Sequence, residues 1–498
     1  MRSVWWGAAL AALVACDGGA ELDAGGPADA GGDAAPALDA ALDDAAVPDG
    51  GAEAAPIDEA LASCTRSGGA GATAAGMDLV RVDLDLDAFP EARCADGTGA
   101  VMYVRRATRP SAADRWVIQL QGGGACSSAD ACAQRWCSVG TNFAADKLSS
   151  RFAPERGTRA TGILADQPAN PFQGWNHVFV HYCSSDLWTG RQPAIEVEGT
   201  HPTEGTPVRY RAAFNGASII DAVVSSLRGE AGPVMAGAET LPDLDDADEV
   251  VLAGASAGGA GVIHNLDRVA ATLRAHNGAC DASGCPLRVF GLIDSIFGVG
   301  LDRLDFSRTT LCTEGSLCTA EAFLRADDAA KTAMWAPALD ESCLAWHART
   351  GSPDGYRCTS NDYVVENHVT TPFILRMGLT DSLIGGGMVE RGFTVPERGD
   401  VRLDLALFAE LVSERLVALA DLSSTANEAA EIERAPGVYG PACAKHETLS
   451  DGPHTYDVRV EVDGAPVSFP DVIQAWRADA GGETVAVTVP GVNPSTCP

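Results

Sequence analysis

Beyond residue 61, short apolar segments alternate with segments of helical period, and this alternation constrains the fold more than any other feature of the sequence. The apolar segments are rich in β-branched and aromatic residues, which is typical of strands buried on both faces. They are residues 79–84, 101–105, 116–120, 177–182, 249–253, 287–293 and 372–377. Helical spacing of apolar residues is clearest at 210–228 and 257–276. The pattern predicts an α/β domain with a mostly parallel sheet flanked by helices, and a site at the carboxyl ends of its strands.

A serine flanked by glycines stands between one predicted strand and one predicted helix. The strand 249–253 leads directly into Gly254-Ala-Ser256-Ala-Gly258, a G-x-S-x-G motif. In a nucleophile elbow the serine occupies a strained turn that only small neighbours permit. The alternatives are an incidental serine in a glycine-rich turn and a phosphate-binding loop, but the turn lacks a Walker lysine and the spacing of a dinucleotide fingerprint. We therefore expect Ser256 to be a catalytic nucleophile.

Three consecutive glycines, 122–124, follow the predicted strand 116–120. The backbone N–H groups of such a loop can approach a ligand closely, as in the oxyanion loop of α/β-hydrolases. A plain tight turn is the alternative, and the position of the loop before the serine motif favours the oxyanion role. We expect the amides of Gly123, Gly124 and Ala257 to bind an oxyanion.

An acid and a histidine are expected after the serine, in that order. Asp381 follows the predicted strand 372–377 in a polar turn, and His446 lies close to Cys443, which could clamp its loop. The alternatives are Asp294 for the acid and His368 or His454 for the base. The histidines show no H-E-x-x-H spacing and the cysteines no C-x-x-C pair, so we expect neither a metal nor a cofactor.

The first 60 residues differ in composition from the rest of the chain. Residues 1–15 predict an export signal whose apolar run is too short to span a bilayer. They end in a sequence that resembles a bacterial lipobox, with Cys16 as the acylated residue; an ordinary secretory signal is the alternative. Residues 16–60 are rich in Ala, Gly and Pro, hold twelve carboxylates and no Lys or Arg, and predict a disordered tether. We expect a folded domain at 61–498 that is exported, either lipid-anchored on the bacterial envelope or secreted.

Charge and cysteine content limit the partners and the compartment. The chain has 35 Lys and Arg against 68 Asp and Glu, and its net charge of −33 repels nucleic acid and anionic lipid head groups. Fifteen cysteines argue against a reducing cytosol, and the fourteen beyond Cys16 could form seven disulfides. Cys126, Cys132 and Cys137 are expected to pair within or just beyond their own loop. We expect a monomer without a nucleic-acid partner, whose membrane contact is the anchor alone.

Several segments carry a family resemblance. They are LQGGGAC at 120–126, YCSSDLWTG at 182–190, GASAGGAG at 254–261, IDS at 293–295, TDS at 380–382 and ACAKH at 442–446. In this order they resemble the pectin acetylesterase family, which includes the Notum-like carboxylesterases of animals. The ending NPSTC at 493–497 is similar to that of the plant members. The resemblance spans roughly residues 75–498.

The resemblance implies a disulfide-bearing α/β-hydrolase that removes acyl groups, acetyl from pectin in some members and a long lipid from a signalling protein in others. It places the triad and the oxyanion amides on the residues already singled out, which are Ser256, Asp381, His446, Gly123, Gly124 and Ala257. Two features depart from the family. A bulky aromatic often stands at the position of Gly124, and the loops before Asp381 hold Trp335 and Trp346, so the acyl pocket can differ.

Asp186 and Trp188 follow the predicted strand 177–182 and are expected at the same sheet edge, where they fix the loop around Cys183 or contact substrate. The expected function is that of a serine carboxylesterase that removes acyl groups, foremost acetyl, from a carbohydrate such as pectin or from a small ester. The acidic chain favours neutral acetylated glycans over de-esterified pectin. The alternatives are a hydrolase of long-chain lipid esters that delipidates protein, and a catalytically inactive glycan-binding surface lipoprotein.

Overall fold

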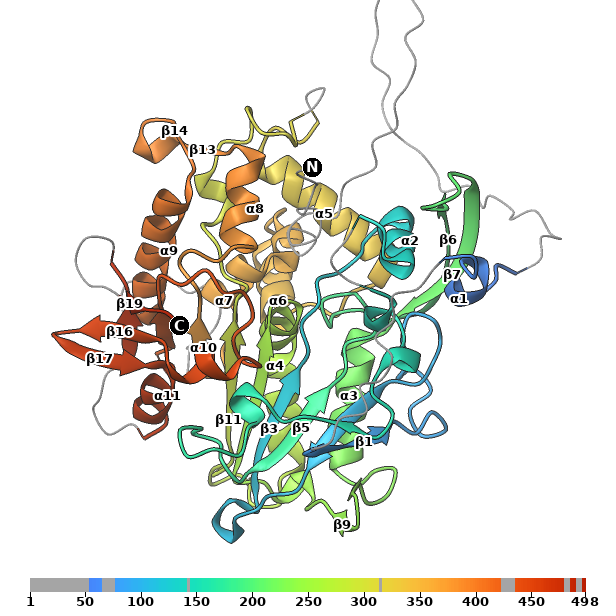
Figure 1. Ribbon diagram of the computed structural model, residues 1–498, viewed down its shortest axis with the longest axis vertical. Coiled ribbons are helices and arrows are strands. Elements are labelled where there is room, and N and C mark those ends of the chain that lie inside the picture. Colours follow the sequence, from blue (N-terminus) through green and yellow to red (C-terminus); the bar gives the residue numbers. More distant parts are fainter. Residues whose placement is uncertain are drawn as a thin grey trace, which may run out of the picture.

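A mixed sheet organises the chain. The computed structural model describes residues 53–64, 77–140, 144–312, 316–421, 435–478, 484–489 and 495–498. Its main sheet has ten strands in the order β18-β15-β12-β11-β10-β3-β5-β2-β1-β4 (Figure 1). The strands are β1 (Leu79–Asp83), β2 (Val101–Arg105), β3 (Arg115–Leu120), β4 (Gly157–Thr158), β5 (Asn176–Val180), β10 (Glu249–Ala255), β11 (Arg288–Asp294), β12 (Phe373–Arg376), β15 (Gly437–Gly440) and β18 (Val485–Val487). Neighbours are parallel from β18 to β5 and antiparallel from β5 to β4, which confirms the predicted mostly parallel sheet and the seven predicted strands.

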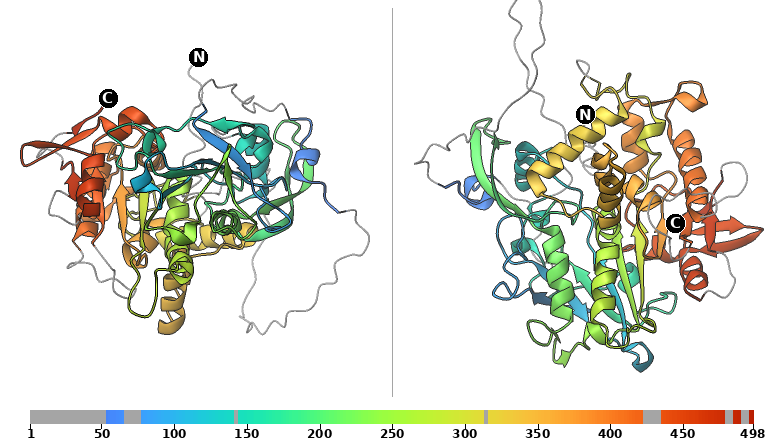
Figure 2. Two further views of the ribbon diagram at one scale, coloured as in Figure 1. Left: turned by 90° about the horizontal axis from the view of Figure 1, so that it is seen from below. Right: turned by 180° about the vertical axis from the view of Figure 1, so that it is seen from behind.

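Helices cover both faces of this sheet. On β10, Val250 and Leu252 belong to the core cluster that includes α3 (Gly216–Leu227) and α4 (Ala257–His276). The alternate residues Val251 and Ala253 belong to the cluster that includes α11 (Phe469–Ala478). In the right-hand view of Figure 2, α3 and α4 lie in front of the sheet. The strand side chains are therefore buried on both faces, as their continuous apolar runs predict.

One predicted helix is partly wrong. Residues 216–227 form α3, but the preceding residues belong to β7 (Pro207–Phe214), which pairs antiparallel with β6 (Gln192–Thr200). Tyr210 and Ala212 are buried on either side of the half-buried Arg211, which is the period of a strand, but Ala213 and Phe214 are both buried as well. Pairing with β6 decides the structure of this segment, and the apolar residues alone do not distinguish the two periods over so short a run. The second predicted helix coincides with α4.

The remaining helices and short strands surround the main sheet. The helices are α1 (Ile57–Ala60), α2 (Ala129–Cys137), α5 (Ala320–Trp335), α6 (Glu341–Thr350), α7 (Asn361–Asn367), α8 (Ile384–Arg391), α9 (Leu405–Ala420) and α10 (Gly452–Tyr456). The strands are β8 (Met235–Ala236), β9 (Glu239–Thr240), β13 (Thr394–Val395), β14 (Val401–Arg402), β16 (Arg459–Val462), β17 (Ala465–Ser468) and β19 (Ser495–Thr496). Among them, α9 contacts β15 and β18, while α5 contacts the β6–β7 hairpin.

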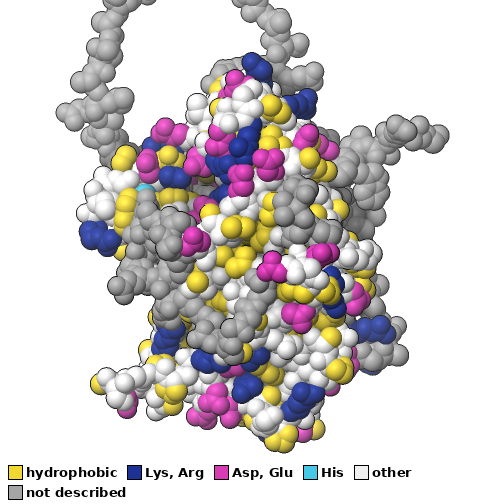
Figure 3. Space-filling view, turned by 90° about the vertical axis from the view of Figure 1, so that its left-hand side faces the viewer, with side chains coloured by type: hydrophobic (Ala, Val, Ile, Leu, Met, Phe, Trp, Pro, Cys, Tyr) yellow, Lys and Arg dark blue, Asp and Glu magenta, His cyan; other side chains and the backbone are white. Residues whose placement is uncertain are grey.

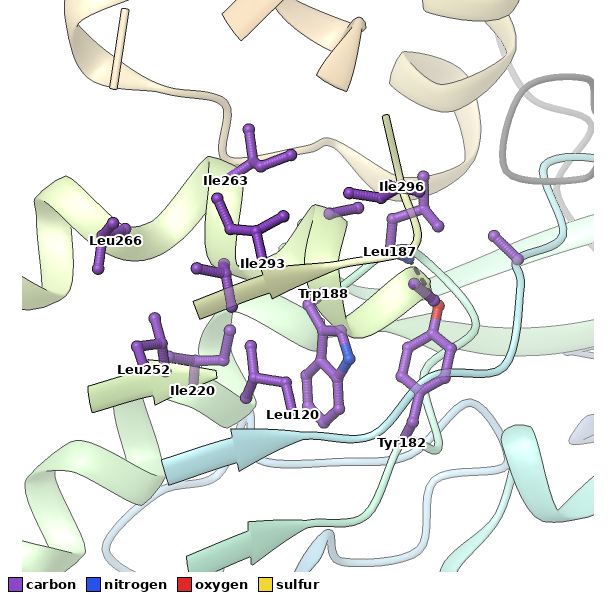
Figure 4. Close-up of a cluster of buried hydrophobic side chains, with 14 of the residues drawn as sticks. Leu120, Tyr182, Leu187, Trp188, Ile220, Leu252, Ile263, Leu266, Ile293 and Ile296 are labelled. Carbon is purple, nitrogen blue, oxygen red and sulfur yellow. Dashed lines mark hydrogen bonds between the residues drawn. The ribbon is translucent and has the colours of Figure 1, made fainter. Parts of the chain in front are cut away.

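The loop after β5 packs between the end of β3 and α4. The rings of Tyr182 and Trp188 lie 4.9 Å apart, beside Leu120 at the end of β3 (Figure 4). A Cβ placed on Gly261 of α4 would lie 2.7 Å from the Cβ of Trp188, so this glycine permits the close approach of the tryptophan. The Tyr182 hydroxyl accepts a hydrogen bond from the Leu187 N–H at 2.7 Å. These contacts give the carboxyl ends of β3 and β10 a packed support.

Seven disulfides join the fourteen cysteines among the described residues. They are Cys64–Cys137, Cys94–Cys183, Cys126–Cys132, Cys280–Cys285, Cys312–Cys318, Cys343–Cys358 and Cys443–Cys497. The prediction of local pairing is right for Cys126 and Cys132. It is wrong for Cys137, whose partner is 73 residues away, because α1 brings Cys64 beside the end of α2.

The predicted tether ends earlier than residue 60. Ile57 and Leu61 are fully buried, and the Arg211 N–H donates a hydrogen bond to the Ala55 carbonyl at 2.8 Å. Asp58 forms an ion pair with Arg151. Residues 53–60 therefore belong to the folded unit. Ile57 and Leu61 are four residues apart, so they lie on one face of α1, and this face packs against the rest of the domain. The predicted export signal, residues 1–15, and residues 16–52 of the predicted tether, Cys16 included, lie outside the described residues.

Within the described ranges, no helix combines the length and the apolarity that a membrane crossing requires.

Candidate active site

Ser256 occupies the turn between β10 and α4 with a strained backbone. Its φ of 54° and ψ of −122° lie in a region that a residue with a Cβ rarely adopts. The flanking glycines of the motif are required by close contacts. A Cβ on Gly254 would lie 2.1 Å from the Gly258 carbonyl oxygen, and one on Gly258 would lie 2.2 Å from the Leu120 carbonyl oxygen. The turn therefore has the geometry of a nucleophile elbow.

The glycine loop lies directly beside this turn. β3 and β10 are parallel neighbours in which Leu120 is paired with Gly254, so the residues that follow them lie at the same sheet edge. Gly124 has a φ of 60°, which favours glycine at this position. Ala257 is the first residue of α4, where the N–H groups have no partner within the helix. The expected oxyanion residues Gly123, Gly124 and Ala257 thus lie on two adjacent segments.

Asp381 and His446 are joined by a hydrogen bond. Nδ1 of His446 and Oδ2 of Asp381 are 2.8 Å apart, and the aspartate is fully buried. Oδ1 of Asp381 accepts the N–H groups of Leu383 and Ile384 at 2.8 and 2.9 Å. The backbone at the start of α8 therefore fixes the carboxylate and leaves its second oxygen for the histidine. Cys443–Cys497 closes the loop that carries His446.

The environment of His446 favours the protonated ring. Burial disfavours the imidazolium, but the charge of Asp381 and its hydrogen bond outweigh burial and raise the pKa of His446 above its ordinary value of 6.5. A histidine with this partner can accept a proton and hold it while the aspartate stabilises the positive charge.

Asp294, the alternative acid, is engaged by other groups. Its carboxylate accepts hydrogen bonds from Arg376 Nη1 at 2.9 Å and from the Thr448 N–H at 2.7 Å. Burial alone would raise the pKa of Asp294, but the Arg376 charge and the hydrogen bonds from Thr448, Arg376 and Ser295 together lower this pKa below the ordinary value. The backbone oxygen of Asp294 accepts the Ser256 N–H at 2.9 Å. Asp294 therefore connects the serine turn to the histidine loop rather than contacting His446.

Among the hydrogen bonds of the described residues, none joins the Ser256 hydroxyl to His446. In free enzymes, such bonds are often long and shorten when the substrate binds. The alternative histidines lie in other surroundings. The ring of His368 packs 5.1 Å from that of Tyr363, and Nδ1 of His454 lies 3.1 Å from Asp451 at the start of α10.

Asp186 and Trp188 lie in a loop with unusual backbone angles. Ser185, Leu187 and Trp188 all have positive φ, between 50° and 63°. The Asp186 carboxylate is fully buried and accepts the N–H groups of Trp188, Gly190 and Gly216 at 3.0, 3.2 and 2.7 Å. Burial raises the pKa of Asp186, and hydrogen bonds from Ser184, Gly216 and Trp188 oppose the rise. The contacts of Asp186 with its own loop favour the loop-fixing role over substrate contact.

A cavity of about 260 Å³, lined by both polar and apolar residues, adjoins the site. Its lining includes Gly123, Ala255, Lys147, Arg159 and Glu447. Glu447 follows the expected base, and burial raises the pKa of its carboxyl group. The ammonium group of Lys147 lies 3.1 Å from Asp146. The cavity thus offers charged and hydrogen-bonding groups beside the serine turn.

Sequence reasoning missed two buried arginines next to the site. Arg376 binds Asp294, and a charged residue inside the apolar run 372–377 was a signal that could have found it. Arg135 of α2 donates to the carbonyl oxygens of Gly123 and Ala125 at 2.6 and 2.7 Å. Nothing in the sequence around Arg135 distinguishes it from a surface arginine, because its partners are backbone atoms of another segment.

Among the described residues, one cluster could offer three metal-ligating atoms, from Cys343, His347 and His368, within 4.8 Å of one another. Cys343 is bonded to Cys358, so its sulfur is not available as a thiolate ligand. None of the expected triad residues belongs to this cluster.

Comparisons with known proteins identify the family and the fold of the chain. A sequence model of the family described as Pectinacetylesterase matches residues 77–498. The chain is 34% identical to palmitoleoyl-protein carboxylesterase notum1 of Xenopus laevis over 254 residues, which are 50% of this chain and 42% of that protein. It is 26% identical to palmitoleoyl-protein carboxylesterase NOTUM of Schmidtea mediterranea over 409 residues, 80% of this chain and 63% of that protein. The matches therefore span less than two thirds of these curated relatives.

A solved structure shares the fold. The Wnt deacylase Notum from Drosophila has a TM-score of 0.54 and 23% sequence identity, over 81% of this chain and 93% of that one. The family match covers most of the chain, including every residue of the expected triad. The chain therefore belongs to the pectinacetylesterase family.

Proposed function

We propose that this protein is a serine carboxylesterase that removes acetyl groups from a carbohydrate such as pectin. The observation that carries the proposal is the 2.8 Å hydrogen bond between His446 and the buried Asp381, at the sheet edge that holds the strained Ser256. A histidine oriented by a buried carboxylate is the arrangement that activates a serine hydroxyl. Membership of a family described as Pectinacetylesterase supports acetyl as the acyl group.

The mechanism is a two-step acyl transfer. Ser256 Oγ attacks the ester carbonyl while Nε2 of His446 takes its proton, and Asp381 stabilises the imidazolium. The amides of Gly123, Gly124 and Ala257 hold the negative oxygen of the tetrahedral intermediate. His446 then donates its proton to the leaving alcohol, which leaves an acetyl-serine. Water, deprotonated by His446, hydrolyses this ester and restores the serine.

The cavity beside the site supports a carbohydrate as the alcohol part of the ester. Its volume is about 260 Å³, and its lining combines hydrogen-bonding side chains such as Gln119 and Ser450 with the apolar Phe179, which suits the polar edges and the apolar face of a sugar ring. Lys147 and Arg159 place positive charge there, although the chain as a whole carries −33. On the face shown in Figure 3, acidic side chains alternate with basic and apolar ones and form no single acidic patch. Because Lys147 pairs with Asp146 and Glu447 lines the same cavity, cations and carboxylates are mixed there, and the whole-chain charge alone does not decide between pectin and a neutral glycan.

A second candidate is the hydrolysis of long-chain acyl esters. The names of the relatives, palmitoleoyl-protein carboxylesterases, favour it. It requires a long apolar acyl pocket, whereas charged and polar side chains form part of the lining of the cavity described here. The third possibility, an inactive glycan-binding protein, requires a defective triad, and the contact between Asp381 and His446 argues against it.

We also propose that the protein is exported. Seven disulfides are typical of an oxidising compartment. The lipobox-like sequence supports anchoring through Cys16, and the enzyme is expected to act as a monomer.

The test is acid release from acetylated pectin, acetylated xylan and p-nitrophenyl esters of increasing chain length. Ser256→Ala is the inactive variant, and Ser225→Ala in α3 is the matched control. Acetate release from polysaccharide that is lost in Ser256→Ala alone supports the proposal. Activity restricted to long acyl esters supports the second candidate, and the absence of serine-dependent hydrolysis refutes both.

A further inference from the structure

The fully buried side chain of Arg135 lies against the loop that is expected to hold the oxyanion. Its Nη1 donates to the carbonyl oxygen of Gly123 at 2.6 Å and its Nη2 to that of Ala125 at 2.7 Å. Nη1 also donates to Oγ of Ser185 at 3.2 Å. Burial lowers the pKa of Arg135 to about 10, so the guanidinium remains charged at neutral pH.

These contacts determine which way the loop amides point. Across a trans peptide bond, the carbonyl of one residue and the N–H of the next point in opposite directions. Because Arg135 binds the Gly123 carbonyl, the Gly124 N–H points away from the guanidinium. If this peptide rotated by half a turn, the Gly123 oxygen would take the place of the Gly124 N–H and would repel a developing oxyanion.

Other buried side chains hold the neighbouring carbonyls. Nε1 of Trp188 donates to the Gln121 oxygen at 3.0 Å, and Nε1 of Trp335 donates to the Cys126 oxygen at 2.9 Å. The donors come from the loop after β5, from α2 and from α5, so three separate elements fix one segment. A segment with three consecutive glycines needs such contacts, because glycine adopts many backbone conformations at similar energy.

We propose that Arg135 is a positioning residue for ester hydrolysis, which keeps the Gly123–Gly124 peptide in the orientation that presents the Gly124 N–H to the oxyanion. This inference rests on the proposed function. Arginine suits the role because its planar guanidinium offers two parallel donors in a fixed geometry and can bind carbonyls two residues apart. Lysine has a single ammonium group and can hold the two carbonyls less rigidly.

The test compares Arg135→Met, which removes the donors, with Arg135→Lys, which keeps one cation. Arg135→Met is expected to lower kcat about 100-fold, the effect of losing one oxyanion donor, with KM within about threefold. Arg135→Lys is expected to lie between this variant and the wild type. The pH profile of the remaining activity is expected to keep its midpoint, since His446 and Asp381 are unchanged. Arg93→Met is the matched control, because Arg93 donates to the Pro90 and Gly97 carbonyls at 2.9 and 3.0 Å in the turn before β2.

A second measurement does not depend on activity. Amide hydrogen exchange in the segment 121–126 of the whole chain is expected to be faster in Arg135→Met than in the wild type and in Arg93→Met. If wild-type protein shows no serine-dependent hydrolysis, the proposed function fails, while the exchange still tests whether Arg135 holds the loop. A folded Arg135→Met with wild-type kcat and wild-type exchange overturns the inference. If Arg135→Met does not fold, wild-type kcat in Arg135→Lys overturns it.

Discussion

Replacing Asp381 by asparagine is expected to abolish most of the activity without displacing the histidine. Oδ1 of Asp381 accepts two backbone N–H groups, from Leu383 and Ile384, and only an oxygen can keep both bonds. The asparagine oxygen therefore takes the Oδ1 position, and its NH₂ group takes the place of Oδ2 opposite Nδ1 of His446. An NH₂ group donates to Nδ1, which forces the histidine proton onto Nε2. The ring then cannot accept the proton of Ser256.

The size of the effect follows from this change of tautomer. In serine triads, the wrong tautomer lowers kcat about 10⁴-fold, which corresponds to about 5.5 kcal/mol in the activation barrier. The variant also loses the carboxylate charge that raises the pKa of His446. Burial then dominates, and the pH dependence of the residual activity is expected to move to lower pH.

The assay is hydrolysis of p-nitrophenyl acetate from about pH 5 to 9, with circular dichroism as the check on folding. Asp294→Asn is the informative comparison, because it changes the other buried carboxylate at the same sheet edge. We expect Asp294→Asn to be destabilised while retaining more activity than Asp381→Asn. A folded Asp381→Asn with kcat within tenfold of the wild type refutes the reasoning. If instead a stable Asp294→Asn shows a kcat about 10⁴-fold below the wild type, the acid role belongs to Asp294.

Three further outcomes are expected. Because the pKa of His446 is raised above 6.5, kcat/KM is expected to fall as the pH drops through the raised pKa. The stability that His446 contributes is complete below pH 6.5 and is lost as the pH rises through the raised pKa of the folded state. A pH-rate profile measures the first trend and melting temperatures at several pH values measure the second, and parallel trends contradict the assignment. Arg376→Met leaves the buried carboxylate of Asp294 without its cation and is expected to lower the free energy of unfolding, measured by urea denaturation, by about 3–5 kcal/mol. A decrease of less than about 1 kcal/mol argues against a buried ion pair. The double change Cys443→Ser and Cys497→Ser opens a loop of 54 residues and is expected to lower the free energy of unfolding by about 4 kcal/mol, measured as a lower Tm. A fall in kcat is also expected, because the loop that carries His446 is no longer closed by the disulfide. An unchanged Tm contradicts this prediction.

The elements that the sequence predicts well are those with a local signal. The run 249–253 is apolar enough to indicate a buried strand, and the motif around Ser256 requires a strand, a turn and a helix in that order. The structure has β10, the strained turn and α4 in these places. Local periodicity does not predict β7, because the apolar residues 212–214 are consecutive and the partner strand β6 is not visible in a local window.

For the site residues, sequence order and family resemblance selected Asp381 and His446 over their alternatives, and spacing alone did not separate Asp381 from Asp294. The distinction lies in contacts that are distant in sequence. Asp294 binds Arg376 and Thr448, and Asp381 binds His446, 65 residues away. Asp294 ends β11 and Asp381 lies in the turn after β12, the neighbouring strand, so the hydrogen-bond partners provide the distinction.

By itself, the sequence determined the α/β class, the parallel strands and the position of the serine turn, because each of these depends on the period of apolar residues or on the small size of neighbours along the chain. Only the tertiary structure decided which carboxylate meets the histidine, which cysteine closes on Cys64 and which arginine holds the glycine loop. These last features depend on backbone atoms and side chains that come together only when the sheet has formed, so no local stretch of sequence encodes them.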